Sequence, residues 1–153
     1  MVDPIGITGT TLAVATLLYS TCRTISDIIR SYEHTPKEYK DLARELNALQ
    51  NTLNSLQTSL QGTSDTSLSP EQRESLKDLD LPLTNCNKVC EDFKQKLSSM
   101  RSNSTEDHTA VWDRFRLHFN KSDVKFLREK LNTAQATVQV ALSVSTLLVP
   151  LSF

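Results

Sequence analysis

Apolar residues recur in steps of three and four between residues 39 and 60. These positions are Tyr39, Leu42, Leu46, Leu49, Leu53, Leu56 and Leu60. This spacing places one apolar stripe on a helix that packs against other helices. Thr35, Pro36 and Glu38 precede the stripe as a helix-start signal, with Thr35 as the cap and Glu38 completing a capping box. Because Gly62 follows the last apolar position, the pattern predicts a helix over about 36–61.

Two later stretches repeat the pattern. The first follows the start signal Ser69–Gln72 and has apolar positions at Leu76, Leu79, Leu83, Cys86, Cys90, Phe93, Leu97 and Met100. The second has them at Val124, Leu127, Leu131, Ala134, Val138, Ala141, Ser145 and Leu148. Pro82 lies inside the first stretch, so we expect a kink or a short break near 80–82, and the sequence leaves open which of the two occurs.

The N-terminal stretch is different, because no charged residue lies between Asp3 and Arg23. From Ala15 onward it has an apolar stripe of its own, formed by Ala15, Leu18, Cys22, Ile25, Ile29 and Tyr32. A helix without a charged face is either central in a bundle or destined for lipid. The C-terminal stretch also lacks charge after Lys130, so we expect the two uncharged segments to pack together. Interspersed Thr, Ser and Gly residues argue against a permanent membrane span, and the start lacks the positive charge of a signal peptide.

These patterns predict an all-α fold with one domain over 1–153. The expected architecture is an up-down helical bundle of four long helices, with coiled-coil-like packing, at about 5–33, 36–61, 70–101 and 122–148. A short helix near 109–119 carries Trp112, Phe115 and Phe119 on one face, and we expect it to cover one end of the bundle. The low glycine content, 3 residues in 153, agrees with an all-α chain.

Composition narrows the function classes. The net charge of -1 gives no general attraction to nucleic acid. Three cysteines without a disulfide-framework spacing favour a reducing compartment, hence the cytoplasm. Cys86 and Cys90 are interpreted as small core residues rather than a redox or metal pair. No catalytic constellation, metal-ligand spacing or cofactor motif is found, so we expect a protein that is not an enzyme.

Two smaller features each allow two interpretations. A basic run comprises Arg114, Arg116, Lys121, Lys125, Arg128 and Lys130. It is either an ordinary solvated face or a surface for anionic lipid headgroups, to which each cation contributes about 1 kcal/mol. Gly6 and Gly9 either permit close helix packing and self-association or belong to a frayed helix start.

The order of these segments resembles a known family. Asp3–Gly9 leads into an Ala/Val/Leu helix, Thr35–Leu42 leads into a Leu-rich helix, Cys86 falls in the middle of the third, and the basic run leads to Leu127–Asn132. This order is similar to the fungal HeLo-like N-terminal domain of STAND and NOD-like receptor proteins. The resemblance covers nearly the whole chain. It implies an N-terminal signalling or effector module whose relatives execute programmed cell death, in innate immunity and heterokaryon incompatibility, by inserting an N-terminal hydrophobic helix into the plasma membrane.

Applied to this chain, the resemblance implies a first helix that is sheathed by the other helices at rest and released on oligomerisation. The inserting residues would be Ile5, Ile7, Leu12, Val14, Leu17 and Leu18. The protein would be cytoplasmic at rest and bound to the plasma membrane on activation. Expected partners are anionic phospholipids, further copies of the chain, and a downstream receptor or amyloid-signalling partner. The alternative is a non-toxic scaffold for oligomerisation or partner recruitment, in which the first helix is simply the central helix of the bundle.

Overall fold

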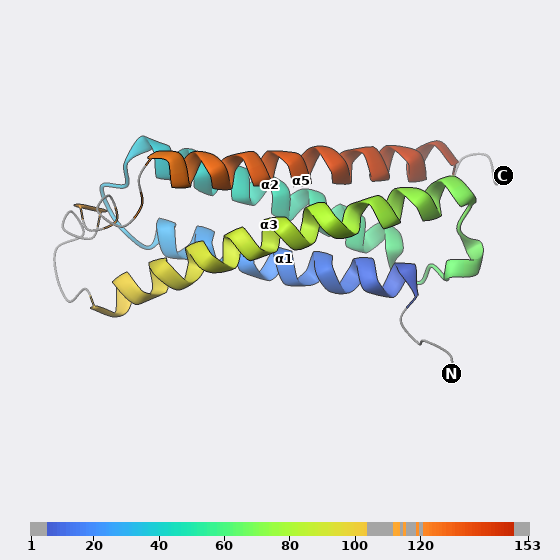
Figure 1. Cartoon of the computed structure of the whole chain (residues 1–153), viewed down its shortest axis with the longest axis horizontal. Helices are drawn as coiled ribbons and strands as arrows, with labels where there is room; N and C mark the ends of the chain where they lie inside the picture. The colour runs from blue at the N-terminus through green and yellow to red at the C-terminus, as the bar shows by residue number, and fades with distance from the viewer. Residues whose placement is uncertain (1–5, 104–111, 114, 116–118, 120, 149–153) are drawn as a thin grey trace.

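The computed structural model describes residues 6–103, 112, 113, 115, 119 and 121–148, and these form an all-α bundle without strands (Figure 1). Its long helices are α1 (Ile7–Arg30), α2 (Lys37–Leu60), α3 (Pro70–Asn103) and α5 (Lys121–Leu148). One turn of 3-10 helix, η1 (Asp65–Ser67), lies between α2 and α3. The predicted fold class and the four long helices are confirmed. Of the predicted short helix near 109–119, the structure describes Trp112, Asp113 and Phe115 as helical, and the remainder lies outside the described residues.

Consecutive long helices alternate in direction, so α1 and α3 run one way while α2 and α5 run the other (Figure 1). α1 packs against α2 and α3, and α5 packs against the same two helices. α1 and α5 therefore occupy opposite corners of the bundle, and the expectation that their uncharged segments pack against each other is wrong. Each helix turns one apolar stripe inward, and the stripes of α2 and α3 fill the space between the two corner helices.

The connection from α2 to α3 consequently crosses the end of the bundle along the other diagonal. It passes the N-terminus of α1, as the green segment between the two helices shows in Figure 1. This crossing places η1 next to the first residues of α1. A polar loop between two helices thus acquires a structural role at the start of a third.

The core consists of the predicted stripes. Every stripe position of α2 and α3 is buried, as are those of α5 from Val124 to Ala141. In α1 the stripe from Ala15 to Ile29 is buried, while Tyr32 packs at its edge. Burying a Leu, Ile or Phe side chain stabilises the fold by about 1.5–3 kcal/mol, so these stripes supply most of the driving force for folding.

α3 continues through Pro82 without a break. The ring of this proline removes one hydrogen bond, to the carbonyl of the residue four positions earlier, Asp78. Asp78 is exposed, so water can reach that carbonyl and the helix persists. Of the two alternatives expected near 80–82, a kink or a short break, the structure excludes the break, and the apolar stripe continues on both sides of Pro82.

The helix-start signals gave one correct and one wrong prediction. At α3, the Gln72 N–H donates to Ser69 Oγ at 3.1 Å and the Ser69 N–H donates to Gln72 Oε1 at 2.9 Å, which is the predicted capping box. At α2, Pro36 occupies the cap position without a side-chain hydrogen bond. The Thr35 hydroxyl donates to the Tyr32 carbonyl in the preceding turn, at 3.1 Å.

An aromatic cluster closes the end of the bundle where α1 finishes and α5 begins. Tyr39 stacks on Trp112 at 4.8 Å between ring centroids and meets Phe115 edge-on at 4.5 Å. Phe119 lies 4.6 Å from Phe93. The Trp112 indole N–H donates to the Glu33 carbonyl at 3.2 Å, so its polar edge is also satisfied. The prediction that these aromatic residues cover one bundle end is confirmed for the described residues.

Candidate functional site

α1 is the one described helix that is long and apolar enough to cross a membrane, judged by length and composition alone. Only 44% of its most apolar window is buried in the bundle. A corner helix buries the side that faces its two neighbours and leaves the other side in water. The outward face of α1 lacks charge before Arg23 and comprises Thr10, Ala13, Thr16, Leu17 and Ser20.

The structure separates the predicted inserting residues into different environments. Leu18 is fully buried in the core, whereas Leu17 is 52% exposed. Ile7, Leu12 and Val14 are half-buried at the edges of the core, and Ile5 lies outside the described residues. The expectation that α1 is sheathed at rest, or central in the bundle, is therefore wrong. The role of these residues in insertion stays a prediction.

The core-facing positions of α1 change character along its length. In the first two turns they are Thr8 and Thr11, which are buried but polar. Large apolar side chains reach the centre only from Leu18 onward, at Leu18, Ile25 and Ile29. The N-terminal half of α1 therefore contributes less apolar burial to the bundle than its C-terminal half.

Side-chain hydrogen bonds connect α1 to its two neighbours. Gln57 of α2 donates from Nε2 to Thr16 Oγ1 at 2.7 Å. On the other side, the Thr21 hydroxyl lies 3.0 Å from both Glu91 Oε1 and Asn87 Oδ1 of α3, and it donates to one of them at a time. Such bonds contribute about 1 kcal/mol each, so they orient α1 without fixing it strongly.

The N-terminus of α1 is capped by a residue from the crossing connection. The Ile7 N–H donates to Asp65 Oδ2 and the Thr8 N–H donates to Asp65 Oδ1, both at 2.9 Å. Gly6, at the cap position, makes no side-chain cap bond, and the first turn carries no acidic residue of its own. Contact with the Thr8 side chain and N–H, with the Ile7 N–H and with nearby Arg73 lowers the pKa of Asp65, although burial opposes this. The sequence analysis missed this residue, because nothing local marks a cap that acts across 58 positions.

Gly6 is required by this cap. A Cβ atom at residue 6 would overlap the Asp65 carboxylate, so only glycine allows the loop to approach the helix start. The close approach at Gly6 is therefore made to η1 of the same chain. Gly9 is half-buried in the first turns of α1. A role for either glycine in self-association stays a prediction.

Three thiols gather where α1 meets α3. Cys22, Cys86 and Cys90 are free, and each is fully buried. A hydrogen bond with Cys22, followed by burial, raises the pKa of Cys90, while Cys86 partly opposes the shift. A hydrogen bond with Cys90, together with burial, raises the pKa of Cys86. Cys86 and Cys90 are therefore protonated and unreactive in the folded bundle, and their burial agrees with the prediction of small core residues.

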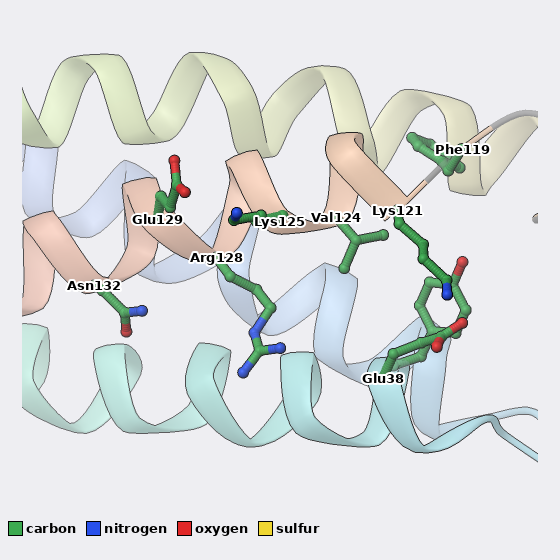
Figure 2. Close-up of a pocket in the computed structure, with 9 residues that line it drawn as sticks. Glu38, Phe119, Lys121, Val124, Lys125, Arg128, Glu129 and Asn132 are labelled. Atoms are coloured by element: carbon green, nitrogen blue, oxygen red, sulfur yellow. The ribbon is translucent and has the colours of Figure 1, made fainter.

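A groove of about 820 Å³ lies between α2 and α5 near the aromatic end. Tyr39, Phe119 and Val124 supply apolar surface, and charged side chains form the rim (Figure 2). Lys121 and Arg128 extend from α5 toward α2, with Glu38 on the opposite side. Lys125, Glu129 and Asn132 complete the lining.

The structure thus brings together three members of the predicted basic run, Lys121, Lys125 and Arg128, at this groove. Arg128 forms a salt bridge with Glu45 of α2, whereas Lys121 and Lys125 are exposed. Lys130 faces a different side of α5, where its Nζ lies 5.1 Å from the centre of the Phe126 ring. Arg114 and Arg116 lie outside the described residues. Lipid contact by these residues stays a prediction.

Among the described residues, no group of three or more His, Cys, Asp or Glu side chains could hold a metal ion. The described surface combines an uncharged helix face on α1 with a cation-rimmed groove on α5.

Residues 2–149 match the family described as pigment biosynthesis cluster protein PigL, N-terminal. The chain belongs to this PigL N-terminal family. The match spans all four long helices, so the family is defined by the bundle as a whole. No curated protein and no solved structure shows a significant match to the chain.

Proposed function

We propose that this PigL N-terminal family domain is a fungal HeLo-like effector module that acts at membranes. In this proposal the domain is cytoplasmic at rest. Oligomerisation releases α1, which then enters the plasma membrane and executes programmed cell death, as an N-terminal domain of a NOD-like receptor or a related protein. The family description refers to an N-terminal domain, which agrees with a module that works together with other parts.

The observation that carries the proposal is the distribution of apolar side chains on α1. Leu17 is half-exposed, and Ile7, Leu12 and Val14 lie at the edges of the core. Lipid would cover this surface, whereas the bundle leaves much of it in water, and apolar burial stabilises by about 25 cal/mol per Å². When the N-terminal half of α1 leaves the bundle, the core loses few large side chains.

The groove between α2 and α5 supports a contact with anionic headgroups. Lys121 and Lys125 are exposed on its rim, and each cation near an anionic surface contributes about 1 kcal/mol. Such a contact would hold the bundle at the membrane while α1 inserts.

The test is dye leakage from anionic vesicles by the intact chain and by Leu17→Arg. The new charge lies on an exposed position of the folded bundle but costs about 2.5–3.5 kcal/mol inside a bilayer. We expect folded Leu17→Arg to lose leakage. Val140→Arg is the matched control, because Val140 is 61% exposed on α5 and should tolerate the same charge without effect. Unchanged leakage by Leu17→Arg would refute insertion of α1.

The alternative is a scaffold that recruits a partner or further copies without entering lipid. The exposed apolar side chains on two opposite corners, Leu17 and Val140, favour it as surfaces for association. A scaffold would not bind the anionic vesicles, but its mass in solution would increase with protein concentration. Leu17→Arg and Val140→Arg would then both reduce the amount of oligomer. The membrane proposal instead expects only Leu17→Arg to lose leakage.

A further inference from the structure

We propose that the crossing connection between α2 and α3 is an autoinhibitory clamp on α1, acting through the two hydrogen bonds from Asp65 to the Ile7 and Thr8 N–H groups. The clamp sets how readily the N-terminal half of α1 leaves the bundle. Its structural part is independent of any membrane activity. Its consequence for lipid entry rests on the function proposed above.

The N-terminus of α1 needs hydrogen-bond partners from outside the helix. The first N–H groups of a helix have no partner within the helix, and their aligned dipoles place about half a positive charge there. Most helices satisfy this end with a neighbouring side chain, but α1 has neither a cap side chain nor an acidic residue in its first turn. Its start therefore depends on a residue delivered from elsewhere in the chain.

The geometry of the clamp is specific. Both carboxylate oxygens of Asp65 are used, one for each N–H group, at 2.9 Å. Arg73 of α3 donates from Nη2 to the Asp65 carbonyl at 2.8 Å, which ties η1 to the start of α3. Gly6 leaves the space that the carboxylate occupies. The helix, the loop and the neighbouring helix thus form one connected unit.

The clamp acts where α1 is least secured by packing. The first two turns bury Thr8 and Thr11, and the large apolar anchors begin at Leu18. The far end of the bundle is closed by the aromatic cluster around Tyr39 and Trp112. Opening of α1 should therefore start at its N-terminus and move toward Leu18. A partner or a second copy that draws the 61–69 connection away would remove the first restraint.

Amide hydrogen exchange of the full chain tests the clamp directly. The Thr10 N–H, which donates to the Gly6 carbonyl at 2.9 Å, reports on the first turn of α1. Loss of a helix cap lowers stability enough to raise exchange by roughly fivefold, so Asp65→Ala should accelerate exchange at Thr10 to Leu12 by about that factor. Asp80→Asn, at an exposed carboxylate of α3, is the matched control and should leave these rates unchanged.

Gly6→Ala disrupts the same contact from the opposite side. It should accelerate exchange at Thr10 to Leu12 in the intact chain and have little further effect when Asp65 is already Ala. This non-additivity is expected only if both changes act through one contact. Wild-type exchange rates in Asp65→Ala, or fully additive effects of the two substitutions, would overturn the clamp.

Vesicle leakage separates this inference from the proposed function. Faster exchange in Asp65→Ala together with increased leakage supports both. Faster exchange without any leakage, in the variant or the wild type, supports the clamp and refutes membrane insertion. Leakage that depends on Leu17 but is unchanged in Asp65→Ala, with unchanged exchange, refutes the clamp and leaves the proposed function standing.

Discussion

Arg128 of α5 donates two parallel hydrogen bonds to the carboxylate of Glu45 on α2. Arg128 Nε lies 2.9 Å from Glu45 Oε2, and Nη2 lies 2.8 Å from Oε1. A hydrogen bond and the charge of Glu45 raise the pKa of Arg128. Arg128 is one of the three cations that line the groove, and this pair already engages its Nε and Nη2 donors. Its role in the resting bundle is to hold α5 beside α2.

A double-mutant cycle measures that role. Glu45→Ala and Arg128→Ala should show a coupling energy of about 0.5–1 kcal/mol, because both side chains are partly exposed and screened by water. The measurement is the free energy of unfolding in urea for the wild type, both single variants and the double variant. Strictly additive effects would show that the pair contributes nothing to stability.

Binding to anionic vesicles should depend instead on the two exposed lysines of the groove, Lys121 and Lys125. Lys121→Ala and Lys125→Ala should each weaken partitioning by about fivefold, which corresponds to about 1 kcal/mol per cation at the surface. Arg128→Ala should weaken it less, because its charge is already opposed by Glu45. Vesicle flotation at fixed salt provides the measurement.

The matched control for these lysines is Lys77→Ala, at an exposed cation of α3 outside the groove. It should leave partitioning close to that of the wild type. Equal losses for Lys77, Lys121 and Lys125 would show that overall charge, rather than the groove, governs binding. Vesicles of zwitterionic lipid should bind none of the proteins by this route.

Neighbouring leucines of α1 should respond very differently to the same substitution. Leu18 is fully buried, so Leu18→Arg leaves a charge in the core and should lower the free energy of unfolding by more than about 3 kcal/mol. Leu17→Arg should change it by less than about 0.5 kcal/mol, because the side chain is half in water. Urea unfolding monitored by helicity decides this, and similar losses in both variants would contradict the assigned orientation of α1.

The contribution of the Asp65 cap to stability should depend on pH. The pKa of Asp65 is lowered below its usual value of 3.8 in the folded protein, by Thr8 first and then by Ile7 and Arg73. Its stabilising contribution is therefore complete above that value and is lost as pH falls through the folded pKa. The stability difference between the wild type and Asp65→Asn should be constant near neutral pH and shrink below about pH 4. If the stability difference between the wild type and Asp65→Asn instead grew as the pH fell, the result would contradict the Asp65 cap.

The apolar stripes were predictable because burial repeats with the period of the helix. Cys86 and Cys90 were placed in the core by their position in a stripe, and both are fully buried. The Ser69 and Gln72 capping box was equally readable, since its partners lie three residues apart. The similar signal at α2 was misleading, since Pro36 rather than Thr35 occupies the cap position and the Thr35 hydroxyl donates to the Tyr32 carbonyl. A start signal in the sequence therefore does not by itself fix which residue becomes the cap.

The features that concern function depend on how the four helices are placed around the core, which the apolar stripes do not specify. The same four stripes allow α1 to stand beside α5 or opposite to it, and only the opposite arrangement carries the connection past the start of α1. The Asp65 cap and the need for glycine at residue 6 follow from that choice. The exposure of Leu17 follows as well, because a corner helix always leaves one face in water. The lack of charge in the N-terminal stretch had left two alternatives open, a helix central in the bundle or one destined for lipid.

Labelling of the buried thiols should report whether α1 has left the bundle. Cys22 belongs to α1 and contacts Cys90 of α3, whereas Cys86 of α3 contacts Cys90 and lies near Lys130 of α5. In solution all three should react slowly with a maleimide, because they are buried and the pKa values of Cys86 and Cys90 are raised. If α1 enters lipid, Cys90 loses its contact with α1 and should be labelled much faster on anionic vesicles, whereas Cys22 moves with α1 toward the bilayer and stays protected. Peptide mass spectrometry distinguishes the three sites. Protein that floats with vesicles while Cys90 remains unlabelled would be bound at the surface with its bundle closed, and insertion of α1 would be refuted.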